Sequence, residues 1–342
     1  MAIKTFSSTI RRREMDAVLT CMVREEIGTG DLALRLTQLV KQKFSVAGAV
    51  ALRSPAIALT YALELLNLEN NTGVILSALA PSWQYQSIVS AGYTPMPVDV
   101  CPDSGLLDVN LVKKSIAEKG RVLLLNECLG QIPDFAAFQE LHIPIIEDIS
   151  QNAGAIVDEN PVGSFGVFSI LGLEERDIIT AGGGAVLMAP EKRDWSVLKQ
   201  KIDEAPITDF LPDINSALAW VQLKEHKKNE EIRKEMNDMY LGSLMQGKHS
   251  TFKTQVENAS PVVYSFPVIL NSGYSDVKKY ALKKDIEIVL AFQDSIATVF
   301  ADQCKHCTQA LSLRLRCVLF PLYPRLGSKK AQKIAKVLAT LP

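Results

Sequence analysis

The sequence predicts an α/β protein, with a three-layer α/β/α large domain followed by a smaller C-terminal α+β domain. Short β-rich runs alternate with helical periodicity through the first half of the chain. The runs are apolar throughout rather than alternating, which is typical of a sheet covered by helices on both faces. With 342 residues, 47% of them hydrophobic, the chain is long enough for one large core and a smaller one.

Seven runs carry the strand signal, and we expect them to form one mostly parallel sheet. They are residues 46–52, 74–79, 94–100, 121–126, 143–147, 166–171 and 183–188. Helix-like segments separate the earlier runs, for example at residues 56–68 and 108–120. This alternation predicts the large domain.

The pattern changes to long helices after about residue 205. A helical segment covers residues 213–240, a strand-like stretch covers 262–270, and a last helix begins after Ser328. We therefore divide the chain into three parts. The prediction is an N-terminal segment, residues 1–30, that packs with the small domain, a large domain over 31–205 and a small domain over 206–342.

Composition excludes several classes of protein. A net charge of −1 gives no general attraction to nucleic acid or acidic lipid, and the basic Arg11–Arg13 is followed at once by acidic residues. The N-terminal residues lack the apolar run of a signal peptide, and no run is long enough to span a membrane, so we expect a cytoplasmic protein. The pair Cys304 and Cys307 has no second pair of ligands, so we expect no metal site.

The chemical signal lies at the end of one strand and in one loop. Asp148 and Gln151 follow directly on the apolar run 143–147, and ligands of open α/β sheets bind at the carboxyl ends of the strands. A helix cap or a turn explains the same spacing. The stretch 168–187 is unusual as well, because a carboxylate-rich loop separates two apolar strands.

The stretch "IIEDISQNAGA", followed by "PVGSFGVFS", resembles the signature of the DegT/DnrJ/EryC1/StrS sugar aminotransferases. Further similar segments occur in the family's order, among them "GYTPMPVDVCPDSGLLD", "LGQIPDF", "DINSALAWVQLK" and "CVLFPLYPRL". The resemblance covers nearly the whole chain. It implies the fold of the fold-type I enzymes that use pyridoxal phosphate (PLP), and a homodimer.

The resemblance also implies roles for particular residues. Asp148 would pair with the pyridine nitrogen of PLP and keep it protonated. Gln151 would lie close to the ring, and Ser169 would bond the phosphate. The start of the family's phosphate loop aligns with Ser54.

The lysine that links the cofactor covalently is missing. Five residues after Ser169 the chain has Glu174, and an alignment anchored on the following glycines gives Asp177 instead. No lysine occurs between Lys119 and Lys192. A carboxylate cannot form an imine with an aldehyde, so this covalent link is excluded at either position.

Other expected cofactor contacts are also changed. Pro55 lacks the N–H that a helix start offers an anion, and Ala56 lacks a hydroxyl group. Pro81 stands where the family has an aromatic that stacks on the ring, although Trp83 lies nearby. The Asn-x-Arg segment that a neighbouring subunit lends to the site aligns with residues 208–210, as Thr208 and Phe210.

Three functions remain open. The first is a family member without aminotransferase activity that acts as a ligand-binding or partner subunit. The second is a lysine-independent enzyme that uses PLP or pyridoxamine phosphate (PMP), with Glu174 or Asp177 as the base. The third is a protein that binds another ligand, such as a nucleotide sugar. We expect no bound cofactor under the first. We also expect a polar cavity partly plugged by residues 172–179, with Arg176 neutralising Asp148 and the loop carboxylates.

Overall fold

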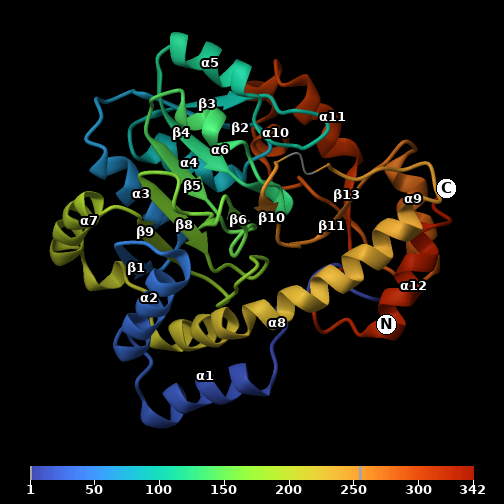
Figure 1. The fold of residues 1–342 in the computed structure, drawn as a ribbon, viewed down its shortest axis with the longest axis horizontal. Coiled ribbons are helices and arrows are strands. Elements are labelled where there is room, and N and C mark those ends of the chain that lie inside the picture. Colours follow the sequence, from blue (N-terminus) through green and yellow to red (C-terminus); the bar gives the residue numbers. More distant parts are fainter. Residues whose placement is uncertain (1, 254–255) are drawn as a thin grey trace.

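The computed structural model describes residues 2–253 and 256–342, and it contains the predicted seven-stranded sheet (Figure 1). The strands are β1 (Gly48–Leu52), β2 (Gly73–Ser77), β3 (Thr94–Val98), β4 (Gly120–Asn126), β5 (Ile145–Asp148), β8 (Phe168–Gly172) and β9 (Ala185–Ala189). Their order is β1-β9-β8-β5-β4-β2-β3. All pairings are parallel except those of β9, which runs antiparallel to both β1 and β8.

Helices cover both faces of this sheet, as the unbroken apolar strands predict. One face packs against α3 (Pro55–Leu65), α4 (Ser82–Ser90) and α7 (Lys192–Glu204). The other face packs against α2 (Asp31–Phe44), α5 (Val109–Ala117), α6 (Phe135–Gln139) and the first half of α8 (Asp213–Leu244). The three-layer prediction is confirmed.

The C-terminal part has its own core and a three-stranded antiparallel sheet. The sheet has the order β11-β13-β12, formed by β11 (Phe266–Ile269), β12 (Val289–Leu290) and β13 (Cys317–Phe320). The helices there are α9 (Tyr274–Lys283), α10 (Ile296–Val299), α11 (Thr308–Arg316) and α12 (Ser328–Leu338). Short strands β6 (Ile156–Val157), β7 (Asn160–Pro161) and β10 (Ala259–Ser260) form a third sheet.

The long helix α8 joins the two cores. Its first half contributes Ala219 and Leu223 to the large core, and its second half contributes Met236, Tyr240 and Leu244 to the C-terminal core. Figure 1 shows it running beneath both parts. The division at residue 205 stays a prediction.

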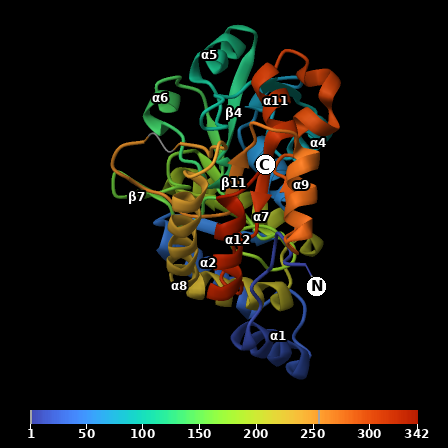
Figure 2. The same cartoon turned by 90° about the vertical axis from the view of Figure 1, so that its right-hand side faces the viewer.

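The N-terminal segment lies against α8 and the C-terminal part. Helix α1 (Arg12–Arg24) packs along α8, and Figure 2 shows it at the outer end of the molecule. Ile3 forms a parallel bridge with Ile286, and the Thr5 hydroxyl donates to the Glu287 carbonyl at 3.0 Å. Within the described residues, none of the helices is both long and apolar enough to cross a membrane.

Parallel pairing brings two polar side chains to the same edge of the sheet. Asn126 ends β4 and Asp148 ends β5, and the two are paired in register. Residues paired in this way point to the same face. Ser169 of β8 pairs with Glu147, so it points to the opposite face from Asp148.

Candidate functional site

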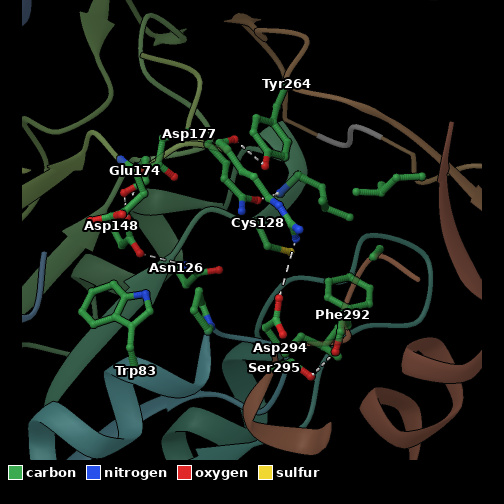
Figure 3. A pocket seen from close by; sticks show the side chains of 18 of the residues that line it. Trp83, Asn126, Cys128, Asp148, Glu174, Asp177, Tyr264, Phe292, Asp294 and Ser295 are labelled. Carbon is green, nitrogen blue, oxygen red and sulfur yellow. Dashed lines mark hydrogen bonds and ion pairs between the residues drawn. The ribbon is translucent and has the colours of Figure 1, made fainter. Parts of the chain in front are cut away.

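A cavity of about 280 Å³ lies at the carboxyl edge of the large sheet (Figure 3). Asn126 and Asp148 come from the ends of β4 and β5, and Trp83 comes from α4. The loop 172–179 contributes a second wall, and residues 291–295 of the C-terminal part contribute a third. This is the edge at which the sequence predicts ligand binding.

Asp148 is buried at 3% exposure and accepts four hydrogen bonds. Its Oδ2 atom accepts from Gln84 Nε2 at 2.6 Å and from Asn126 Nδ2 at 3.1 Å. Its Oδ1 atom accepts from the Ser150 amide at 3.1 Å and from the Ser150 hydroxyl. A carboxylate has about four lone-pair positions, so protein donors occupy all of them.

These donors stabilise the charged form of a carboxylate that is buried in a low-dielectric environment. Burial raises the pKa of Asp148, and the hydrogen bonds from Ser150, Asn126 and Gln84 lower it in part. The sequence analysis did not identify any of the three donors. Asn126 was predictable, because it ends the strand next to β5.

The loop 172–179 is fixed by its own backbone. The Leu173 amide donates to the Gly184 carbonyl at 2.8 Å, and the Leu173 carbonyl accepts from the Ala181 and Gly183 amides. The Asp177 Oδ2 atom accepts from the Glu174 amide at 2.8 Å. Glu174 and Asp177 both line the cavity, and the partial plug expected from the sequence stays a prediction.

The pKa of Asp177 depends first on burial and also on the nearby charge of Asp148. Burial raises the pKa of Asp177 well above its usual range, and the charges of Asp148 and Glu174 raise it further. Gly172 lies against Asp177, since a Cβ atom at Gly172 would sit 2.4 Å from the Asp177 Oδ2 atom. Glu174 is exposed, and its Oε1 atom accepts from the Gly184 amide at 3.4 Å.

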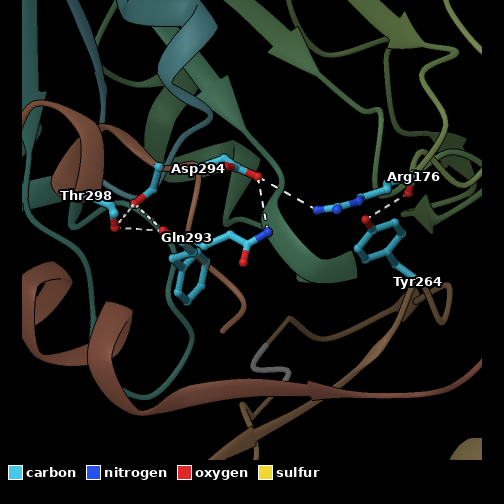
Figure 4. A network of polar contacts seen from close by, with 7 residues as sticks. Arg176, Tyr264, Gln293, Asp294 and Thr298 are labelled. Carbon is cyan, nitrogen blue, oxygen red and sulfur yellow. Dashed lines mark hydrogen bonds and ion pairs between the residues drawn. The ribbon is translucent and has the colours of Figure 1, made fainter. Parts of the chain in front are cut away.

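The expectation that Arg176 neutralises Asp148 and the loop carboxylates is wrong. Its guanidinium pairs with Asp294 of the C-terminal part at 3.7 Å and lies 5.0 Å from the Phe6 ring centroid. Its carbonyl accepts from the Tyr264 hydroxyl at 2.8 Å (Figure 4). Arg176 therefore joins the loop to the C-terminal part and pairs with Asp294 rather than with Asp148 or Asp177.

Of the other three predicted site residues, Gln151 lines the cavity, whereas Ser54 and Ser169 lie outside it. Gln151 lines the cavity, and its Oε1 atom accepts from the Leu129 amide at 2.7 Å. Ser54 caps α3, because its hydroxyl accepts from the Ile57 amide at 3.2 Å. Ser169 is fully buried on the far face of the sheet and donates to the Gly163 carbonyl at 2.7 Å. Neither Ser54 nor Ser169 lines the cavity.

A second pair of carboxyl groups lies inside the sheet. Glu147 accepts from the Gly163, Phe165 and Gly166 amides at 2.6–2.8 Å. Burial raises the pKa of Glu147 to about 7 and that of Glu127 well above its usual range. Because three N–H groups favour the ionised form of Glu147, we assign the proton of the pair to Glu127.

The sheet order, the two-faced helical cover and the cavity at the strand ends define an aminotransferase-like fold of the PLP-dependent class. A sugar aminotransferase of Streptococcus pneumoniae in its PLP form superimposes with a TM-score of 0.90 at 18% identity, over 99% of this chain and 98% of that one. An aminotransferase of Helicobacter pylori, involved in pseudoaminic acid biosynthesis, gives 0.86 at 16% identity, over 99% and 98%.

The chain belongs to the DegT/DnrJ/EryC1/StrS aminotransferase family, whose model matches residues 8–201 and 207–339. GDP-perosamine synthase of Caulobacter vibrioides is 23% identical over 79% of this chain and 78% of its own length. L-glutamine:2-deoxy-scyllo-inosose aminotransferase of Micromonospora echinospora is 29% identical over 42% of this chain. That match covers only 35% of the relative's length.

The residues of the cavity do not fit PLP. In the described part of the chain no lysine lines the cavity, and the two expected lysine positions hold carboxylates. Asp148 has no lone pair left for a pyridine N–H. The α3 N-terminus begins with Pro55 and uses the Ser54 hydroxyl for its own cap.

Electrostatics act in the same direction. Within the described residues, the cavity is lined by one guanidinium, that of Arg176, and by four carboxyl groups, those of Asp148, Glu174, Asp177 and Asp294. A unit negative charge about 6 Å from one carboxylate is repelled by roughly 3 kcal/mol at an effective dielectric constant of about 20. The repulsion between a phosphate group and these carboxylates therefore disfavours binding by more than the loss of one hydrogen bond would.

Proposed function

We propose that this protein has lost PLP-dependent transamination and keeps the family's cleft as a ligand-binding pocket, serving as a binding or partner subunit in nucleotide-sugar or polysaccharide metabolism. One observation carries the proposal. The carboxylate expected to hold the pyridine nitrogen is saturated by Gln84, Asn126 and Ser150. Saturation of Asp148 and loss of the lysine remove two separate requirements of the cofactor.

The area of metabolism is proposed from relatives. One relative is a GDP-perosamine synthase and another acts on 2-deoxy-scyllo-inosose. Both names describe chemistry on sugar-like rings. We carry over only this class of metabolism, and not their reactions.

A lysine-independent enzyme is the second candidate, and one observation favours it. Asp177 lies in the cavity with a raised pKa, which is a property of general acid–base residues. The same saturation of Asp148 opposes it. Binding of PMP without a covalent link distinguishes the two candidates.

Absorbance spectroscopy of the purified protein tests the proposal. We expect a colourless protein. When PLP or PMP is added, the absorbance spectrum of the mixture should equal the sum of the spectra of the free protein and the free cofactor. We also expect no transamination with glutamate or glutamine as amino donor. A shift of the PMP absorbance spectrum on addition of the protein, which the substitution Asp148→Asn abolishes, would support the second candidate. Amino transfer by the wild-type protein would refute both the proposal and the assignment of Glu174 or Asp177 to the lysine position.

A further inference from the structure

Four carboxyl groups and the side-chain amides of Asn126 and Gln151 line the cavity. Asn126 is 7% exposed, and its Nδ2 atom donates to Asp148. An amide that donates to a carboxylate must turn its oxygen the other way, and Figure 3 shows the Asn126 oxygen directed into the cavity. Among the described residues this Oδ1 atom has no hydrogen-bond partner. A donor group of a ligand in the cavity can therefore bond to this oxygen.

The carboxylates stand on the same side as this amide oxygen. Asp148, Glu174 and Asp177 lie together on one side of the cavity, opposite Phe292 and Asp294 (Figure 3). Among the described residues, Asp177 uses only its Oδ2 atom, which accepts from the Glu174 amide. Its Oδ1 atom has no protein donor in the described part of the chain, so it can accept from a ligand when the carboxyl group is ionised, and a cationic ligand favours that ionised form. A positively charged donor satisfies both acceptors and the local charge.

The walls of the cavity favour an organic cation over a metal ion. Trp83, Tyr264 and Phe292 line it, and the face of an aromatic ring attracts an ammonium group. Within the described residues, no group of three or more His, Cys, Asp or Glu side chains has a metal-binding arrangement. Asn126 and Asp177 lie on one side of the cavity, whereas Asp294 on the opposite side already pairs with Arg176.

The size of the cavity limits the rest of the ligand. Its volume of about 280 Å³ is at the lower end of the range for small-molecule pockets. One six-membered ring with its substituents is a suitable occupant. A nucleotide-linked sugar whose phosphates lay beside the carboxylates would be repelled by them, which disfavours that class.

We infer that the cavity binds a protonated primary amine carried on a single compact, hydroxyl-bearing ring. The ammonium group donates to Asp177 Oδ1 and Asn126 Oδ1, and the ring packs against Trp83 and Phe292. This inference rests on the proposed function, because a bound cofactor would occupy the same space.

Ligand-observed NMR with three matched probes tests the inference. Glucosamine at a pH that keeps its amine protonated should bind, glucose should bind at least about tenfold more weakly, and glucose 6-phosphate should not bind at millimolar concentration. Equal binding of glucosamine and glucose, preference for the phosphate, or no binding of glucosamine at all would each overturn it.

Two variants assign the effect to the named side chains. Asp177→Asn and Asn126→Leu should each reduce the preference for glucosamine over glucose to about twofold or less. Glu175→Gln is the matched control, because Glu175 is an exposed carboxylate of the same loop that does not line this cavity. An equal loss in the control would show that only general attraction to the acidic loop is involved.

The two proposals fail in different ways. If PLP or PMP binds and changes the absorbance spectrum, the proposed function is wrong whatever the amine does. If the protein stays indifferent to both cofactors and shows no preference for the amine, only the ligand class is wrong.

Discussion

Asp148 and Asp177 share one cavity but are stabilised differently. Asp148 accepts four hydrogen bonds from the protein, whereas in the described chain Asp177 accepts one, from the Glu174 amide. Hydrogen bonds to the charged form lower a carboxyl pKa, and burial without them raises it. Asp177 is therefore the group whose protonation should respond to pH.

We predict that Asp177→Asn stabilises the protein near neutral pH. Burial and the charges of Asp148 and Glu174 raise the folded-state pKa of Asp177, so the folded state holds its proton to higher pH than the unfolded state. Stability then falls as pH rises through the folded-state pKa, and the asparagine variant avoids this loss. We expect a rise in Tm of about 1–3 °C at neutral pH that disappears near pH 4.

Thermal unfolding over a series of pH values measures this difference. Glu175→Gln is the control, since an exposed carboxylate of the same loop should change Tm little. A difference between Asp177→Asn and wild type that does not depend on pH would contradict the assignment.

Restoring one lysine should not restore the cofactor. We predict that Glu174→Lys and Asp177→Lys, each alone, show no PLP absorbance that survives dialysis beyond the wild-type level. A lysine supplies the covalent link, but Asp148 remains saturated and the α3 N-terminus still begins with Pro55. Retained PLP absorbance in one variant only would show that the lysine was the single missing group.

The residues at the ends of strands were easier to predict from the sequence than the side chains that bond to them. Asp148 was predicted because it directly follows an apolar run. Gln84 was not, since its contact depends on how α4 packs on the sheet. The Arg176–Asp294 pair joins segments far apart in the sequence, and local pattern carries no information about such a pair.

At the scale of elements, β8 and the loop after it determine the shape of the cavity. Gly172 ends β8 beside Ser150 and Asp177. Most of the seven strands were predictable because they are short, largely apolar runs, whereas the edge strand β3 contains two prolines and is only partly buried. The closure of the loop onto Leu173 was not, because backbone hydrogen bonds leave little trace in side-chain pattern.

We predict that Gly172→Ala loosens the loop 172–179. The new Cβ atom would lie 2.4 Å from Asp177 Oδ2 and 2.6 Å from Ser150 Oγ, so both side chains must move. Hydrogen exchange of the Leu173, Ala181 and Gly183 amides should become faster. Gly242→Ala is the control within α8, where the added Cβ would meet no atom within 4 Å beyond the adjoining backbone of the helix, and we expect it to stabilise by roughly 0.5–1 kcal/mol. Unchanged exchange in Gly172→Ala would contradict this role for Gly172.

At the scale of the whole molecule, the helix α8 joins both cores and the N-terminal segment. Its apolar residues Val221 and Leu223 are buried within the chain, and α8 packs against α1 and α2. These apolar positions are therefore explained without a partner. Exposed apolar side chains occur instead on α1, at Met15, Leu19 and Met22.

We still propose a homodimer, as the resemblance to the family implies. Light scattering at micromolar concentration should give twice the mass of one chain. Leu19→Glu tests whether the exposed face of α1 takes part, since a buried unpaired charge is costly in an apolar interface. A monomer in the wild-type protein would contradict the proposal, and a dimer unaffected by Leu19→Glu would place the interface elsewhere.

A crystal structure of the protein soaked with PMP tests the loss of the cofactor most directly. PMP is the suitable probe because it needs no lysine to bind. We predict no density stacked above Asp148, with Gln84 and Asn126 still donating to its Oδ2 atom and the loop 172–179 still lining the cavity. Density for PMP with its pyridine nitrogen against Asp148, and Gln84 displaced, would contradict the account.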